Sequence, residues 1–98
     1  MKEQVIVVGL GRFGSAVARE IEGLGHEVLA VDVNEAAVND VAPDVTHAVQ
    51  LDASDEGALK AVGAGDFSTA IVGIAGFTEA SIFATMALRE MGVRTIAK

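Results

Sequence analysis

The chain has 98 residues, which is the size of one small domain with a single hydrophobic core. Its composition, 51% hydrophobic and 21% charged with no cysteine, excludes a disordered chain, a disulfide framework and any site built on a thiolate. Fourteen acidic against seven basic side chains give a net charge of −7, which argues against binding to nucleic acid or to anionic membranes.

Five short runs rich in valine and isoleucine have the length and composition of β-strands. Apolar residues recur at helical spacing between them. In chain order, the predicted strands are residues 5–8, 28–31, 45–51, 69–75 and 93–97. Strands that alternate with helices imply right-handed crossovers and a mostly parallel sheet covered on both faces. We therefore predict an α/β fold with a Rossmann-like, doubly wound parallel sheet.

The predicted helices have recognisable boundaries. Gly25 follows the first helix, Asn34 is a candidate N-cap for the second, and Pro43 lies beyond its end. Ser54 is expected to open the third helix and Gly63 to close it.

No repeat or linker divides the sequence, so residues 1–98 are expected to form one domain. The fifth strand ends at Ala97, where a six-stranded nucleotide fold continues into another helix and strand. We expect a domain truncated at its C-terminal end, with the sixth strand missing. No apolar run approaches the roughly 18 residues of a membrane span, and the amino terminus lacks the features of a signal peptide. A cytoplasmic domain without direct membrane insertion is therefore expected.

A glycine-rich loop follows the first predicted strand and precedes the first predicted helix. Residues 9–14 fit the pattern G-x-G-x-x-G. In such a loop, Gly9 makes the tight turn, Gly11 lets a pyrophosphate approach the backbone, and Gly14 lets the helix pack close to the strand. The helix N-terminus then offers N–H groups and a positive dipole end to phosphates. The loop predicts a dinucleotide or nucleotide site.

An acidic residue at the end of the second strand completes this pattern. Asp32 lies 18 residues after Gly14, where the motif expects an acceptor for ribose hydroxyls. A carboxylate repels a 2′-phosphate, and the following residues 33–35 contain no arginine that would bind one, so NADP is disfavoured. Asp32 does not distinguish NAD from ATP or ADP, because all three carry the same adenosine ribose.

Two further positions are candidate contacts. Arg12 lies inside the loop and is placed to reach terminal phosphates, although it could equally lie along the helix surface. Residues 52–54 leave the third strand on the side where adenine is expected, and Ser54 is expected to cap the next helix in either case.

For both histidines a structural role is favoured over a catalytic one. His26 follows Gly25 and is expected in a surface turn, away from the carboxyl ends of the strands. His47 is two residues from Val45 and from Val49, which predicts a partly buried, structural side chain on the apolar side of its strand.

The helix predicted for residues 79–91 is apolar on more than one side. One stripe is wide enough to cover the sheet, and Ile82 and Met86 point away from it. We expect these two residues to meet their counterparts in a homo-oligomer, at least a dimer. The stripe predicted to face the sheet contains Ala80, Phe83, Ala84, Ala87, Leu88 and Met91.

Five stretches of the sequence closely resemble the RCK family, the regulator of potassium conductance domains, also called TrkA N-terminal or KTN domains. The resemblance covers essentially the whole chain, and the pair Arg12-Phe13 inside the glycine loop is its most specific part. The five stretches are residues 9–14, 24–28, 30–34, 46–49 and 52–54.

This resemblance implies a Rossmann-like domain that binds ATP, ADP or NAD(H) and regulates a membrane potassium transporter or channel, without catalysis. It also implies a cytoplasmic position at the inner face of the membrane, reached through that partner. The alternative is an enzyme, the cofactor-binding half of an NAD-dependent dehydrogenase, for which the sequence offers no evident acid, base or substrate domain. The implied nucleotide-binding residues are Gly9, Gly11, Arg12, Phe13 and Gly14 for phosphate, Asp32, Val33 and Asn34 for ribose, and Asp52, Ala53 and Ser54 for adenine.

Overall fold

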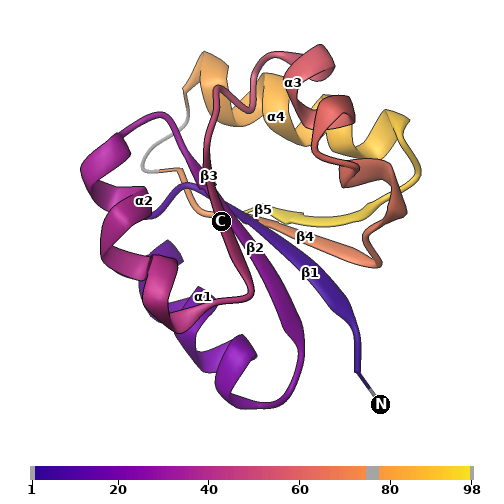
Figure 1. Ribbon diagram of the computed structural model, residues 1–98. Coiled ribbons are helices and arrows are strands. Elements are labelled where there is room, and N and C mark those ends of the chain that lie inside the picture. Colours follow the sequence, from indigo (N-terminus) through magenta and orange to yellow (C-terminus); the bar gives the residue numbers. More distant parts are fainter. Residues whose placement is uncertain (1, 75–77, 98) are drawn as a thin grey trace.

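The computed structural model describes residues 2–74 and 78–97, and it contains one parallel sheet of five strands in the order β3-β2-β1-β4-β5. Figure 1 shows this sheet between two pairs of helices. The strands are β1 (Gln4–Val8), β2 (Glu27–Asp32), β3 (His47–Gln50), β4 (Thr69–Val72) and β5 (Arg94–Ala97). The helices are α1 (Arg12–Gly23), α2 (Glu35–Val41), α3 (Glu56–Ala61) and α4 (Glu79–Glu90), with 3-10 turns at Ala42–Asp44 and Ala64–Asp66. The predicted α/β fold with a doubly wound parallel sheet is confirmed.

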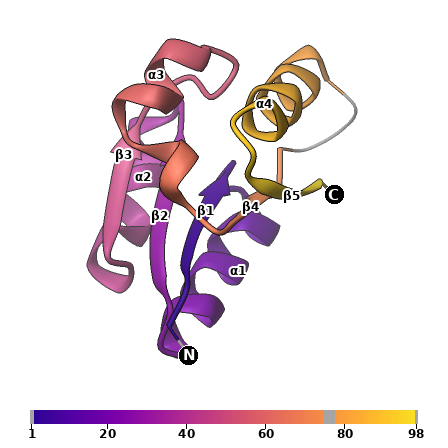
Figure 2. The same cartoon turned by 90° about the vertical axis from the view of Figure 1, so that its right-hand side faces the viewer.

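Successive residues of the central strands point to opposite faces of the sheet, and each face has its own core. In β1, Val5 and Val7 pack with α1 and α2, whereas Ile6 and Val8 pack with α3 and α4. Figure 2 shows the two layers from the side, with α3 and α4 together above the sheet and α1 below it. Because helices cover both faces of the sheet, the sequences of its central strands are nearly continuous apolar runs, as expected for a parallel sheet.

The strand order reverses beside β1. The chain moves from β1 outward to β2 and β3, and then returns to the other side of β1 for β4 and β5. In open α/β sheets, ligands bind at the carboxyl ends of the strands where the order reverses. The glycine loop follows β1 directly, so the fold places it at this point.

Most of the predicted helix boundaries agree with the structure. Asn34 is the N-cap of α2, where its side chain accepts a hydrogen bond from the backbone N–H of Ala37. Gly25 and Gly63 follow α1 and α3 with φ of 99° and 76°, a left-handed conformation that favours glycine.

The prediction that Ser54 caps the third helix is wrong. The N-cap of α3 is Asp55, whose carboxylate accepts hydrogen bonds from the N–H groups of Gly57 and Ala58. Ser54 instead donates its hydroxyl to Asp52. The Ser54 hydroxyl is thus bound to Asp52, two residues before it, and the helix is capped by Asp55, the residue after it.

The prediction for His47 is also wrong, because its side chain is exposed. Val45 lies before β3 and packs against the α1–α2 core, so it does not share a face with Val49, which packs against the α3–α4 core. His47 is the first residue of a strand at the sheet edge. The predicted strand 69–75 is observed as Thr69–Val72, and Ala75 lies outside the described residues.

The stripe predicted for α4 is narrower than expected. Ala84, Ala87 and Leu88 are buried and Met91 is half-buried, but Ala80 and Phe83 are exposed. The residues of the stripe that pack in the core under α3 and α4 are Ala84, Ala87, Leu88 and Met91, whereas Phe83 is 50% exposed and lies outside that core. The predicted exposure of Ile82 and Met86 is confirmed, since they are 37% and 52% exposed.

Candidate functional site

A cleft of about 810 Å³ opens at the carboxyl ends of β1 to β4, where the strand order reverses. Its volume lies in the range of roughly 300–1,000 Å³ that is usual for small-molecule sites. Every predicted contact residue lines it except Gly14 and Asn34. The lining residues are Val8, Gly9, Leu10, Gly11, Arg12, Phe13, Val31, Asp32, Val33, Leu51, Asp52, Ala53, Ser54, Gly73, Ile74 and Ala80.

The three glycines of the loop differ in what a side chain would meet. Gly9 has φ of 92°, and a Cβ atom there would lie 2.9 Å from the backbone nitrogen of Ile74. A Cβ atom on Gly14 would overlap the carbonyl oxygen of Gly9. Gly9 and Gly14 are therefore required by the fold itself.

Gly11 is different, because a Cβ atom there would meet no atom of the described residues within 4 Å. Packing inside the protein therefore does not explain a glycine at this position. The residue is the N-cap of α1 and lines the cleft, where a ligand could come close to the backbone. This geometry fits the close approach of a pyrophosphate.

The N-terminus of α1 is suited to anions. In the part of the chain that the structure describes, no side chain caps this helix, and its first turn contains no acidic residue. The orphan N–H groups and the positive end of the helix dipole therefore face the loop without a competing carboxylate.

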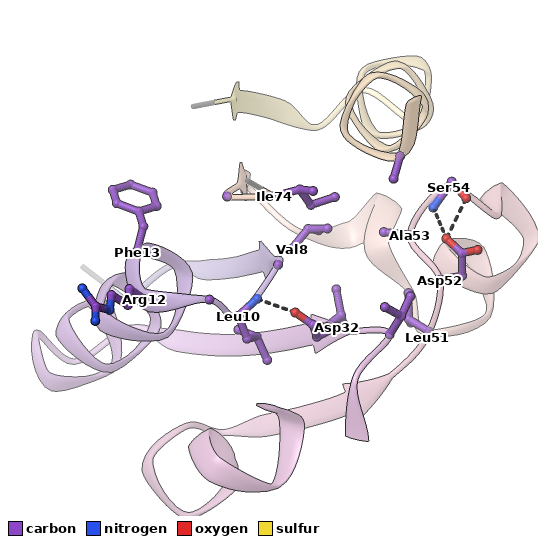
Figure 3. Close-up of a pocket in the computed structure, with 16 residues that line it drawn as sticks. Val8, Leu10, Arg12, Phe13, Asp32, Leu51, Asp52, Ala53, Ser54 and Ile74 are labelled. Atoms are coloured by element: carbon purple, nitrogen blue, oxygen red, sulfur yellow. Dashed lines mark hydrogen bonds between the residues drawn. The ribbon is translucent and has the colours of Figure 1, made fainter. Parts of the chain in front are cut away.

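Asp32 lies at the end of β2 with both carboxylate oxygens engaged by the backbone. Oδ2 accepts a hydrogen bond of 2.6 Å from the N–H of Leu10, and Oδ1 accepts one of 2.8 Å from the N–H of Asn34. Figure 3 shows the carboxylate beside the glycine loop, directed at the backbone N–H of Leu10. A carboxylate oxygen can accept more than one hydrogen bond. Asp32 can therefore also accept hydrogen bonds from ribose hydroxyls.

Arg12 and Phe13 lie at one end of the cleft, and residues 52–54 lie at the other (Figure 3). Arg12 is exposed, and within residues 2–74 and 78–97 its guanidinium has no ion-pair partner, whereas Arg19 is paired with Asp40 and Asp44. A guanidinium without a carboxylate partner can bind a phosphate without first breaking an ion pair.

The other end of the cleft combines an anchored carboxylate with apolar walls. Asp52 Oδ1 accepts hydrogen bonds from the hydroxyl and the backbone N–H of Ser54, at 2.6 and 2.9 Å. These two hydrogen bonds lower the pKa of Asp52 below its usual value, and the bond from the Ser54 hydroxyl has the larger effect. Ala53 is buried and Leu51 is half-buried, so this end offers apolar contacts to a flat ring.

Sequence reasoning missed several residues of the cleft. Gly73 follows β4, where its N–H donates to the carbonyl oxygen of Val8, and the glycine after this strand could have been noticed. Gln50 does not line the cleft, but it donates its side-chain amide to the carbonyl oxygen of the lining residue Val33 and so fixes the turn after β2. Nothing in the sequence pattern indicates the Gln50 contact, because it depends on the register of β3 against β2.

The two histidines lie away from the cleft. His26 precedes β2, where its Nδ1 accepts a hydrogen bond from the N–H of Glu3, and His47 is the first residue of β3. Both are therefore at the amino ends of the strands, opposite the glycine loop. Among the described residues, none of the cleft-lining side chains is a histidine, lysine or tyrosine.

Residues 5–98 match the sequence model of the TrkA-N domain. The chain belongs to the TrkA-N domain family. It is 43% identical over 96 residues to the Ktr system potassium uptake protein C of Bacillus subtilis, and 43% identical over 94 residues to protein A of the same system and organism. These matches cover 98% and 96% of this chain but 43% and 42% of the relatives. The chain therefore spans less than half the length of these relatives.

Solved structures support the fold. The NAD(P)-binding domain of an exopolyphosphatase-related protein from Archaeoglobus fulgidus superposes with a TM-score of 0.78 at 27% identity, covering 97% of this chain and 71% of that one. The C-terminal domain of Kef from Shewanella denitrificans, in its AMP-bound form, gives a TM-score of 0.73 at 22% identity, covering 96% and 57%.

Proposed function

We propose that this TrkA-N domain binds an adenine nucleotide, ATP, ADP or NAD(H), and thereby regulates a membrane potassium transporter or channel. The observation that carries the proposal is the pairing of an open Gly11 and an uncapped helix N-terminus with the Asp32 carboxylate across one cleft. The relatives named as Ktr system potassium uptake proteins support the regulatory part.

In the proposed complex, the nucleotide lies along the cleft. Its phosphates contact residues 9–14, with Gly9, Gly11, Phe13 and Gly14 shaping the loop and Arg12 binding the terminal phosphates. Its ribose hydroxyls donate to Asp32, beside Val33 and Asn34. Its adenine lies against Asp52, Ala53 and Ser54.

Membrane association would come from the partner. Of the described helices, α1 and α4 are the longest with 12 residues each, and none has the length and hydropathy of a membrane-spanning segment. A transporter subunit at the inner face of the membrane would hold the domain there, and a change of bound nucleotide would be transmitted through the protein that contains the domain.

A graft tests the regulatory part. This chain replaces the matching region of the Ktr system potassium uptake protein A in Bacillus subtilis cells that lack the native protein. We expect the graft to restore potassium uptake and the same graft with Asp32→Ala to fail, although both proteins accumulate equally. Equal uptake with both grafts would contradict regulation through the nucleotide site.

The alternative, a dehydrogenase half, has less support, because the described lining of the cleft contains no histidine, lysine or tyrosine to transfer a proton beside a hydride. Its two carboxylates, Asp32 and Asp52, already accept hydrogen bonds within the protein. Fluorescence of NADH separates the two functions. A binding domain changes the fluorescence without consuming NADH, whereas an enzyme oxidises it when a suitable substrate is added.

Arg12→Ala tests the proposed orientation of the nucleotide. If the guanidinium binds terminal phosphates, the variant should weaken the binding of ATP more than that of ADP, and the binding of ADP more than that of adenosine. The reason is that each phosphate missing from the ligand removes one partner of the guanidinium. Charge-assisted hydrogen bonds contribute roughly 1.5–3 kcal/mol each, so we expect about a tenfold or greater loss for ATP. Calorimetric titration measures all three. An equal loss for the three ligands would mean that Arg12 acts only on the fold.

We further propose that the domain forms a homo-oligomer, at least a dimer, through α4. Ile82, Phe83 and Met86 form one exposed apolar surface on this helix, and Phe83 makes it larger than the sequence predicts. Exposed apolar residues grouped in this way are typical of contacts between proteins. In a symmetric dimer, the same surface of each copy would meet the other.

Ile82→Glu combined with Met86→Glu is expected to convert the oligomer into a monomer, because unpaired charge would be buried at the contact. Light scattering at high micromolar concentration measures the mass. Leu24→Glu is the matched control, since Leu24 is 69% exposed at the end of α1, away from α4. A monomeric unmutated domain would refute the proposal.

A further inference from the structure

Two consecutive N–H groups of the glycine loop are bound by two consecutive residues of β2. The N–H of Gly9 donates to the backbone carbonyl of Val31 at 2.9 Å, and the N–H of Leu10 donates to the side chain of Asp32 at 2.6 Å. The second bond lies beyond the end of β1, where the chain has turned at Gly9 with φ of 92°, and its acceptor is a carboxylate in place of a backbone carbonyl. The loop is held to β2 up to Leu10.

The N–H of Leu10 needs this acceptor. Leu10 is 5% exposed, and a buried backbone donor without a partner costs free energy comparable to that of a lost hydrogen bond. Leu10 lies between the glycine that makes the turn and the glycine at the N-cap of α1. The position of its N–H group therefore fixes where the backbone of the loop runs.

The carboxylate itself is held on its other side. Asp32 Oδ1 accepts from the N–H of Asn34, the carbonyl of Val33 is bound by Gln50, and Asn34 caps α2. The turn after β2 is thus fixed from β3 and from α2. Its rigidity allows Asp32 to act as a support for the loop.

We propose that Asp32 is a positioning residue for the glycine loop, which it holds in its nucleotide-binding shape before a nucleotide enters. The proposal rests on the proposed function only where it names the loop as the phosphate site. Because both oxygens keep unused lone pairs, ribose hydroxyls can be accepted without breaking either bond. One carboxylate then joins the ribose and phosphate parts of the site.

Amide hydrogen exchange of the nucleotide-free domain, measured by NMR, tests the proposal. Loss of a hydrogen bond to a charged group should speed exchange of the Leu10 amide by roughly tenfold to a hundredfold in Asp32→Ala. Asp52→Ala is the matched control, since it removes another carboxylate of the same cleft that does not contact Leu10, and it should leave this rate unchanged.

Asp32→Asn gives a second readout. Its side-chain oxygen can still accept from the N–H of Leu10, but it carries no full negative charge, so exchange of the Leu10 amide should be faster than in the unmutated domain and slower than in Asp32→Ala. Unchanged Leu10 exchange in Asp32→Ala would overturn the proposal, and if that variant does not fold, unchanged Leu10 exchange in Asp32→Asn would overturn it. No nucleotide is present, so failure here is distinct from failure to bind nucleotide.

Discussion

Asp32→Ala is expected to lower the affinity for both ATP and NADH by at least about a hundredfold, since hydrogen bonds to a charged group contribute roughly 1.5–3 kcal/mol each and the ribose offers two hydroxyls. The carboxylate also supports the N–H of Leu10, so the loss includes the shape of the phosphate loop. Calorimetric titration of both nucleotides into the variant measures the effect.

Glu35→Ala is the matched control for this variant. Glu35 is an exposed carboxylate in the first turn of α2, three residues beyond Asp32, and it does not line the cleft. This substitution also removes one negative charge, close to Asp32 in the sequence, and we expect affinities for ATP and NADH close to those of the unmutated domain. Asp32→Ala with unchanged affinity for both ATP and NADH would exclude Asp32 as the ribose acceptor.

Gly14→Ala is expected to have the largest effect on stability. Its Cβ atom would overlap the carbonyl oxygen of Gly9, and backbone cannot move aside as a flexible side chain can. Overpacking usually costs about 1–3 kcal/mol, and a clash with backbone lies at or above the upper end. With roughly 4–8 °C of Tm per kcal/mol in a domain of this size, the Tm should fall by more than about 10 °C.

Gly23→Ala separates this clash from the general effect of replacing a helical glycine. Gly23 is the last residue of the same helix, and no described atom lies within 4 Å of a Cβ atom there. Alanine favours the helix over glycine by about 0.5 kcal/mol or more, so the Tm should rise by a few degrees. Thermal unfolding followed by circular dichroism measures both variants. Equal Tm changes would contradict the packing of Gly14 against Gly9.

The sheet and the glycine loop could be predicted because their signals are local. Apolar runs mark the buried strands, and residues 9–14 with Asp32 form one pattern at fixed spacing. The cap of α2 could also be predicted, because Asn34 is a residue of N-cap type that stands directly before the apolar helical pattern of this helix.

Features that depend on particular contacts could not be predicted. Ser54 and Asp55 are both good N-caps, and the residue types alone do not show that the Ser54 hydroxyl donates to Asp52 while Asp55 caps the helix. The exposure of Phe83 depends on how much of α4 the sheet covers, which spacing along the helix does not define. The contact between Asp32 and Leu10 joins a side chain to a backbone group 22 residues away, so no local pattern indicates it.

Calorimetric titration of ATP, ADP, NAD and NADH into the purified domain tests the central claim most directly. We predict saturable binding of at least one of these nucleotides, with one site per chain and with the affinity lost in Asp32→Ala. Absence of binding for all four at millimolar concentration, with a folded domain, would contradict the assignment of the cleft as a nucleotide site.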